Sequence, residues 1–147
     1  MMTSYTAPQR DMLFVLNHLA GLEAVSQLPG LEDATPDMAA AILDEAAKFA
    51  AGVLAPINAS GDLQGCRWDN GVVTPADGFA DAYASFCETG WNAMPAQPEF
   101  GGQGLPSLVS SAVQEMWKSA NMAFALCPML TLGAVNAIAE HASDELK

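Results

Sequence analysis

The stretch from Asn121 to Ala139 contains no charged residue, which restricts the folds open to this chain more than any other feature. A membrane-spanning helix needs about 20 consecutive apolar residues. This stretch is rich in alanine rather than leucine, and it is interrupted by Asn121, Pro128, Thr131 and Asn136. We therefore expect a helix that is buried on all sides at the centre of a bundle, where no face needs a charge.

Apolar residues also recur at helical spacing in the first third of the chain. One stripe follows Pro8, and it predicts a helix that ends near Pro29-Gly30. A second stripe runs from Met38 to Val53, after Thr35-Pro36-Asp37 has supplied an N-cap, a proline at the first helical position and an early acid. On the opposite face, the spacing of Asp44 and Lys48 predicts a weak, exposed ion pair.

The helical pattern breaks from Ala55 to Thr74, where Pro56, Gly61 and Gly65 predict a loop with a small hairpin at Asn70-Gly71. Thr74-Pro75 repeats the cap-and-proline signal and predicts a third helix that Gly90 ends. The helical stripe of this third helix consists of Phe79, Tyr83, Phe86 and Cys87.

Three prolines and three glycines between Trp91 and Pro106 predict a connector, with a positive φ at Gly101, Gly102 or Gly104. A fourth helix is expected from Pro106-Ser107 to Ala120. The chain then carries a cap and two acids, Ser143 to Glu145, which are typical of the start of a helix. Because this start has no body before Lys147, we expect the chain to be part of a longer protein.

Charge and cysteine usage limit the partners and the compartment. The chain has 17 acidic and 5 basic residues and a formal net charge of -12, which excludes nucleic-acid binding and opposes attachment to anionic membranes. Cys66, Cys87 and Cys127 are widely spaced and odd in number, and the start of the chain lacks the pattern of a secretion signal. These features favour a reducing, cytoplasmic location.

The residues by themselves assign no reaction. His18 and His141 stand apart, so no metal site is predicted, and none of the cysteines lies in a catalytic motif. The glycines of Gly101-Gly102-Gln103-Gly104 do not have the spacing of a phosphate-binding loop. Glu99 and Glu115 are lone carboxylates with a default surface role. We predict no catalytic, cofactor-binding or metal-binding residue, and an acidic all-α bundle.

The chain resembles the acyl-CoA dehydrogenase family in several motifs that occur in the family's order. They begin with Gly90-Trp91 and the Pro-Glu-aromatic-Gly-Gly pattern that ends at Gly102, and they continue through Glu115, Ala120-Asn121 and Gly133-Ala134 to His141-Lys147. The first 16 residues resemble the N-terminal extension of a bacterial branch that includes the 3-methylmercaptopropionyl-CoA dehydrogenases.

The resemblance implies a fold, a role and a division of the chain. It implies an N-terminal extension helix over residues 1–33 and the family's N-terminal helical domain over residues 34–147, before the middle β-domain. It also implies that FAD and an acyl-CoA substrate bind in the full-length protein, with no cofactor for this chain alone and no independent activity. The domain would wall one side of the acyl pocket, with the acyl tail facing Leu126, Met129, Leu130 and Gly133.

Two alternatives stay open. The four wall residues are also accounted for by ordinary core packing. The chain as a whole is also explained as a non-catalytic helical module that covers its apolar surface by pairing with another chain or with a second copy of itself. Related flavoproteins, such as acyl-CoA oxidases, share the same helical domain. The chain departs from the family at two positions. Phe100 replaces a frequent tyrosine, and Ala142 stands where relatives commonly have glycine, which predicts strain at a helix end.

Overall fold

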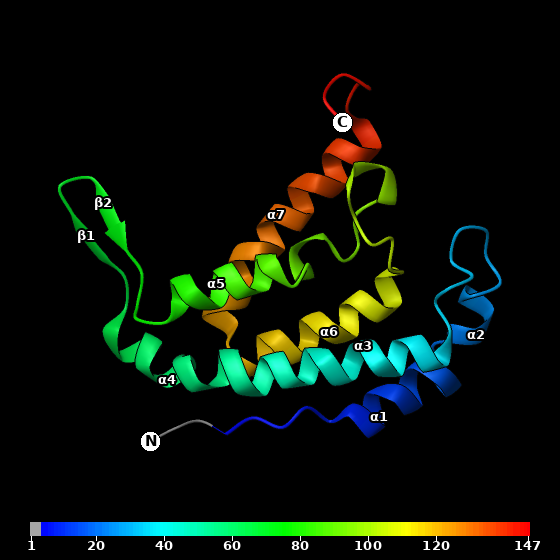
Figure 1. Ribbon diagram of the computed structural model, residues 1–147, viewed down its shortest axis with the longest axis horizontal. Helices are drawn as coiled ribbons and strands as arrows, with labels where there is room; N and C mark the ends of the chain where they lie inside the picture. The colour runs from blue at the N-terminus through cyan, green and yellow to red at the C-terminus, as the bar shows by residue number, and fades with distance from the viewer. Residues whose placement is uncertain (1–3) are drawn as a thin grey trace.

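The computed structural model describes residues 4–147, which form helices and one projecting hairpin (Figure 1). The α-helices are α1 (Gln9–Phe14), α2 (Leu22–Val25), α3 (Pro36–Phe49), α4 (Ala55–Gln64), α5 (Phe79–Glu88), α6 (Ser107–Ala120) and α7 (Met122–His141). The strands are β1 (Arg67–Asp69) and β2 (Val72–Thr74). Two π-helical segments, η1 (Val15–Leu19) and η2 (Ala50–Leu54), and two 3-10 turns, η3 (Trp91–Ala93) and η4 (Pro98–Phe100), complete the fold.

The core lies where α3, η2 and α6 pack side by side, with α1 on one flank and α5 on another (Figure 1). Its centre is aromatic: the rings of Phe86 and Trp117 meet edge to face with centroids 5.2 Å apart, and Phe49 lies 6.4 Å from Trp117. Leu43 and Val113 are fully buried beside them. Edge-to-face contacts of this kind stabilise a core beyond the burial of area.

The first predicted helix is shorter than its stripe suggested. It begins after Pro8 as expected, passes through η1 and ends at Leu19 rather than near Pro29. Gly21 adopts a left-handed φ of 73°, which breaks the helix before the short α2 begins. The amphipathic pattern continues across the break because both parts face the same core.

The start of α3 confirms the predicted cap. The backbone N–H of Met38 donates to the Thr35 hydroxyl at 3.2 Å, and Pro36 occupies the first turn. The predicted ion pair is also present, because the Lys48 ammonium lies 2.8 Å from Asp44 and 2.7 Å from Glu45. All three side chains are exposed, which limits the contribution of this cluster to stability.

The loop predicted from Ala55 is wrong over its first half. The helix continues from α3 through η2 into α4 and ends at Gly65, which has a φ of 64°. Pro56 is tolerated because it lies in the first turn of α4, directly after the π-helical segment η2. Gly61 allows close packing, since a Cβ at this position would lie 2.5 Å from the Phe79 ring.

The hairpin predicted at Asn70-Gly71 is confirmed. Both residues have positive φ, and Trp68 pairs with Val73 across the two antiparallel strands. The next helix begins later than Thr74-Pro75 indicated: its N-cap is Gly78, with a φ of 83°, and α5 starts at Phe79. Gly90 follows the end of α5 in a left-handed conformation, as predicted.

The connector from Trp91 to Pro106 confirms the predicted need for glycine. Gly101 and Gly104 have φ values of 84° and 65°. Gly102 is required for a different reason, because a Cβ there would overlap the backbone of Ala96. The fourth predicted helix is α6, which begins at Ser107 as expected and ends at Ala120.

The burial predicted for the uncharged stretch is wrong. The stretch forms the N-cap and most of α7. Within α7 only Phe124, Ala125 and Pro128 are buried, and 17% of its most apolar 18-residue window lies inside the protein. The helix contacts α6 and α4 near its beginning and then extends away from them (Figure 1). Within residues 4–147, α7 is the one helix long and apolar enough to cross a membrane.

The end of the chain differs from two expectations. Residues 143–147 form a turn in which Leu146 and Lys147 donate backbone hydrogen bonds to the Ser143 carbonyl, rather than a helix. Ala142 has a φ of -80°, so it carries none of the strain predicted for a positive φ at this helix end. The helix therefore ends without a need for glycine.

Candidate functional site: an apolar groove beside α7

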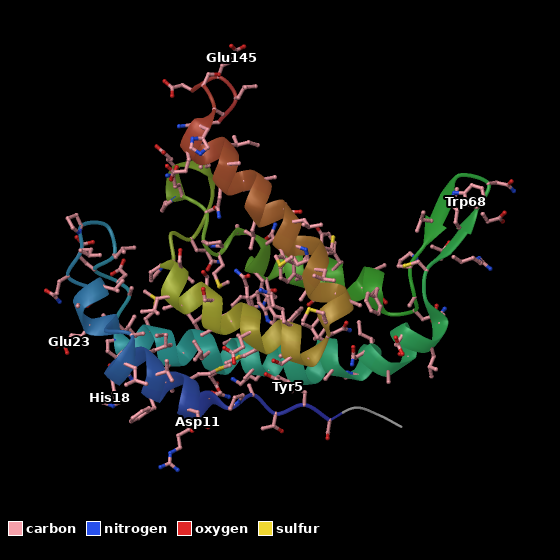
Figure 2. All side chains as sticks on the ribbon, turned by 180° about the vertical axis from the view of Figure 1, so that it is seen from behind. Tyr5, Asp11, His18, Glu23, Trp68 and Glu145 are labelled. Atoms are coloured by element: carbon pink, nitrogen blue, oxygen red, sulfur yellow. The ribbon has the colours of Figure 1, made fainter. Side chains whose placement is uncertain are left out.

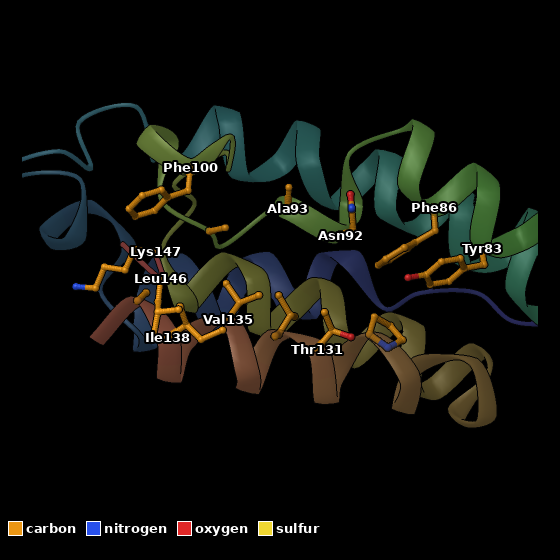
Figure 3. Close-up of a pocket in the computed structure, with 14 residues that line it drawn as sticks. Tyr83, Phe86, Asn92, Ala93, Phe100, Thr131, Val135, Ile138, Leu146 and Lys147 are labelled. Atoms are coloured by element: carbon orange, nitrogen blue, oxygen red, sulfur yellow. The ribbon is translucent and has the colours of Figure 1, made fainter. Parts of the chain in front are cut away.

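A concave surface lies between α5, the connector and α7. This apolar groove has a volume of about 400 Å³ (Figure 3). Its walls come from α5, the connector, α7 and the C-terminal turn, with residues Tyr83, Phe86, Asn92, Ala93, Ala96, Phe100, Pro128, Thr131, Leu132, Val135, Ile138, Ala139, Leu146 and Lys147. Apolar side chains dominate this set, as is typical of sites that bind small organic ligands.

The α5 wall is formed by two aromatic side chains. Phe86 is 1% exposed and joins the groove to the core, whereas Tyr83 is 44% exposed and stacks on Phe86 with ring centroids 6.1 Å apart. The pKa of Tyr83 is raised, first by electrostatic repulsion from Cys87 and then by burial and a hydrogen bond with Cys87. The phenol therefore stays protonated at neutral pH and offers a neutral hydroxyl.

The α7 wall follows from helical spacing. Pro128, Leu132, Val135 and Ala139 recur at intervals of three or four residues, which places them on one side of the helix. Thr131 and Ile138 stand on the same side, and their side chains reach toward the opposite wall in Figure 3. Thr131 is the polar exception in a wall that is otherwise apolar.

The connector wall is held rigidly. The backbone N–H groups of Gln103, Gly104 and Leu105 donate to the carbonyls of Ala93, Ala96 and Met94 at 3.0, 2.9 and 3.1 Å. The Gln103 side chain adds a hydrogen bond of 3.1 Å to the Gly90 carbonyl. Met94 is completely buried beneath the turn. A loop with this many internal bonds presents a preformed surface.

The polar side chains in the lining of the groove are few, and they are those of Tyr83, Asn92, Thr131 and Lys147. Within residues 4–147, no group of three or more His, Cys, Asp or Glu side chains could hold a metal ion. The lone carboxylate Glu99 is exposed, and it does not line the groove. The groove can enclose an apolar chain and offer it a phenol, an amide and a hydroxyl at its edges.

The four residues predicted to face the acyl tail lie outside the groove. Leu126 and Leu130 are 45% and 72% exposed, and Gly133 is exposed as well, so core packing does not account for these three. Met129 is half-buried over a small hollow beside Trp117. Sequence reasoning missed Val135 and Ile138, because a stretch that is apolar all round has no polar face to mark the side that points outward.

Comparison with known proteins identifies the family. Residues 36–147 match the description "Acyl-CoA dehydrogenase, N-terminal domain". This match covers most of the chain, and the helical fold agrees with it, so the chain belongs to the acyl-CoA dehydrogenase family.

Two curated relatives extend the match to almost the whole chain. The 3-methylmercaptopropionyl-CoA dehydrogenase of Ruegeria pomeroyi is 38% identical over 144 residues, and the butyryl-CoA dehydrogenase of Syntrophomonas wolfei is 29% identical over 154 aligned positions. Each alignment covers 98% of this chain but 24% of the relative. The chain thus spans about a quarter of the length of the curated relatives it matches.

The basic residues do not fit a flavin dinucleotide. Its pyrophosphate is anionic and needs cationic or backbone donors gathered in one place. The five basic side chains are dispersed over α1, α3, β1, α6 and the C-terminal turn, as Arg10, Lys48, Arg67, Lys118 and Lys147. The described residues therefore provide no cationic bed for the pyrophosphate, and we assign no cofactor-binding residue.

Proposed function

We propose that this chain acts as the N-terminal helical domain of an FAD-dependent acyl-CoA dehydrogenase, which desaturates an acyl-CoA thioester between its α and β carbons. In this proposal the domain forms one wall of the acyl pocket and has no activity of its own. Three findings support the proposal: the family match, the similarity to two acyl-CoA dehydrogenases and the apolar groove.

The observation that carries the proposal is the exposure of α7. The helix has no charge from Met122 to Ala139, yet Leu130 is 72% exposed and Ile138 is 46% exposed. Apolar area left in water costs about 25 cal/mol per Å². A surface of this kind is stabilised when a ligand or another protein surface covers it. An acyl chain together with neighbouring domains meets that requirement.

We assign the acyl tail to the apolar groove because a concave surface buries more of a ligand than a convex one. Phe86, Val135 and Ile138 would exclude water from the tail, and the Tyr83 and Thr131 hydroxyls would limit its position. The prediction for Leu126, Met129, Leu130 and Gly133 places the tail on another side of α7, and the experiment below separates the two assignments.

The experiment uses a chimera. This chain replaces the matching 144 residues of the Ruegeria pomeroyi enzyme, and acyl-CoA oxidation is followed with an artificial electron acceptor. We expect turnover by the chimera and none by the chain alone. Val135→Glu should raise KM for acyl-CoA, because it places a charge in the groove, whereas Leu130→Glu should leave KM unchanged. The reverse pattern would support the four-residue prediction, and turnover by the isolated chain would refute the proposal.

A second candidate function rests on the same exposed helix. A non-catalytic module could cover α7 with another chain or with a second copy of itself, in the cytoplasm and apart from membranes and nucleic acids. The apolar side chains exposed on the hairpin favour this candidate, because Trp68 is 72% exposed. Sedimentation velocity tests the homo-oligomer, because a strictly monomeric, well-folded chain would exclude it. A separate flotation assay with lipid vesicles tests the location, because a chain that floats with the vesicles would not be apart from membranes.

A further inference from the structure

A second groove runs between α1 with η1 on one side and α6 on the other. This α1–α6 groove has a volume of about 330 Å³, and its lining shares no residue with the apolar groove described above. Its floor is aliphatic, with Met12 and Leu16 from the N-terminal segment and Leu108 and Ala112 from α6. Met12 and Leu16 are 8% and 3% exposed, so the floor is well packed.

Two carboxylates belong to the lining of this groove. Asp11 comes from α1 and Glu115 from α6, and both residues are exposed. The ion pairs found among residues 4–147 all involve Lys48 with Asp44 or Glu45, so neither carboxylate has a cationic partner in the described chain. The lining includes no Lys, Arg or His.

The negative charge at this groove acts on the residue beside it. The hydroxyl of Tyr5 is buried and makes no hydrogen bond of good geometry in the described structure. Burial raises the pKa of Tyr5 first; a contact with Ser119 opposes this shift, and the charge of Glu115 adds to it. The Tyr5 hydroxyl therefore lies close enough to the Glu115 carboxylate to be affected by its charge.

Apolar side chains are also exposed on the two elements that form one wall of the groove. Phe14, Val15 and Leu19 are 56%, 45% and 72% exposed on α1 and η1. A strip of aliphatic and aromatic groups flanked by two unpaired carboxylates matches a helix with apolar residues on one face and lysine or arginine beside them.

We propose that the α1–α6 groove is a docking site for a basic, amphipathic helical segment of a partner protein. Charge complementarity selects this occupant. A second copy is a poor partner, because the chain has a net charge of -12 and only five basic residues, which are dispersed. An anionic membrane is repelled for the same reason. This inference is independent of the acyl pocket, since the two grooves lie on different elements.

Binding is measured with a synthetic helix of about 15 residues that carries leucine on one face and lysine beside it. The helix is labelled, and its fluorescence anisotropy is titrated with the protein at low and high salt. We expect binding that weakens with salt, because exposed charges are screened within about 10 Å at 0.1 M. The same helix with glutamate in place of lysine should not bind.

Matched variants separate docking from general attraction to an acidic protein. The double variant Asp11→Asn with Glu115→Gln should lower the affinity for the lysine helix by about fivefold to tenfold. Asp62→Asn with Asp69→Asn removes the same charge from α4 and the hairpin, and it should change the affinity by less than about twofold. Val15→Ser should weaken binding through lost apolar contact, whereas Val72→Ser on the hairpin should not.

Several outcomes overturn the proposal. Equal weakening by the two charge-removing pairs means non-specific attraction, and equal binding of the glutamate helix means that charge does not select the partner. A dimer that dissociates when Asp11 and Glu115 are neutralised assigns the groove to a second copy. Stronger binding to phosphatidylserine vesicles than to the lysine helix assigns it to a membrane. Circular dichroism checks that each variant is folded. If the double variant unfolds, the affinities of the single variants Asp11→Asn and Val15→Ser test the proposal in its place.

Discussion

The Asn121 side chain joins two parts of the chain that are 67 residues apart in sequence, because its amide Nδ2 donates a hydrogen bond of 3.1 Å to the Leu54 carbonyl. Its Oδ1 accepts from the Phe124 backbone N–H at 3.1 Å, so the same residue caps α7. Asn121 is completely buried. One side chain thus fixes where α7 leaves the core and ties that point to the π-helical segment η2.

Asn121→Ala should lower the free energy of unfolding by about 2 to 3 kcal/mol, because it removes the α7 cap and the buried hydrogen bond to the Leu54 carbonyl. Asn121→Asp keeps an acceptor for Phe124 but loses the donor to Leu54. Asn121→Asp should therefore lose the hydrogen bond to the Leu54 carbonyl in η2 and keep the cap of α7. Urea denaturation monitored by circular dichroism measures both, and an unfolding midpoint of Asn121→Ala equal to that of the parent would contradict the assigned role.

Gly102→Ala should destabilise the connector strongly, by about 3 kcal/mol or more, because the new Cβ would overlap the Ala96 backbone rather than a movable side chain. Gly133→Ala is the matched control. A Cβ on Gly133 meets nothing within 4 Å, and alanine favours a helix more than glycine does, so this variant should be neutral or slightly stabilising. Thermal unfolding measures the stability of the two variants. Equal unfolding temperatures would show that the connector moves to accept the new Cβ and would contradict the prediction.

Tyr5 gives a prediction about alkaline pH (Figure 2). Its pKa is raised in the folded protein above its ordinary value of 10.0, chiefly by burial. The resulting stability is present below the unfolded pKa and is lost as the pH rises through the folded pKa, since the buried phenolate is disfavoured. Tyr5→Phe should remove this alkaline loss while leaving stability near neutral pH unchanged or higher. An identical decline of both proteins above pH 10.0 would show that Tyr5 does not contribute.

The exposed cluster around Lys48 gives a contrasting prediction. The pKa of Asp44 is lowered, first by its hydrogen bond with Lys48, so its stabilising effect is present above the unfolded pKa and is lost as the pH falls through the folded pKa. Because the pair is exposed, Asp44→Asn should change stability little, and the change should shrink further in high salt. A large effect that persists at high salt would require a buried role for Asp44.

Leu130→Lys should reduce the apolar surface of α7 without unfolding the protein, since Leu130 is 72% exposed. We expect weaker binding of a hydrophobic dye and higher solubility, with the unfolding midpoint kept. Leu43→Lys is the opposite control, because Leu43 is completely buried and its replacement by a charge should prevent folding. Reduced stability of Leu130→Lys in the isolated chain would show that α7 is already covered.

Local sequence signals predicted the features that depend on neighbouring residues. Thr35 caps α3 and Asn70-Gly71 forms the hairpin turn as expected, because each conformation is set within a few residues. The glycines of the connector were also predicted, since positive φ is a local requirement at Gly101 and Gly104.

The features that depend on distant residues could not be read in this way. Pro56 looked like a helix breaker, but it lies in the first turn of α4, directly after η2, and that segment is tied to Asn121. The apolar groove was missed because its walls, Tyr83 and Val135, meet only in the folded chain. An absence of charge in α7 indicated burial but could not tell burial within this chain from burial against another surface.

The exposure of α7 has a consequence for the life of the protein in a cell. An uncharged helix held open to water resembles the surfaces that chaperones and quality-control proteases recognise on unfinished chains. A copy whose α7 stays uncovered would then be open to removal by these proteases. The folded domain would then last in the cell only where a ligand or another protein surface covers α7.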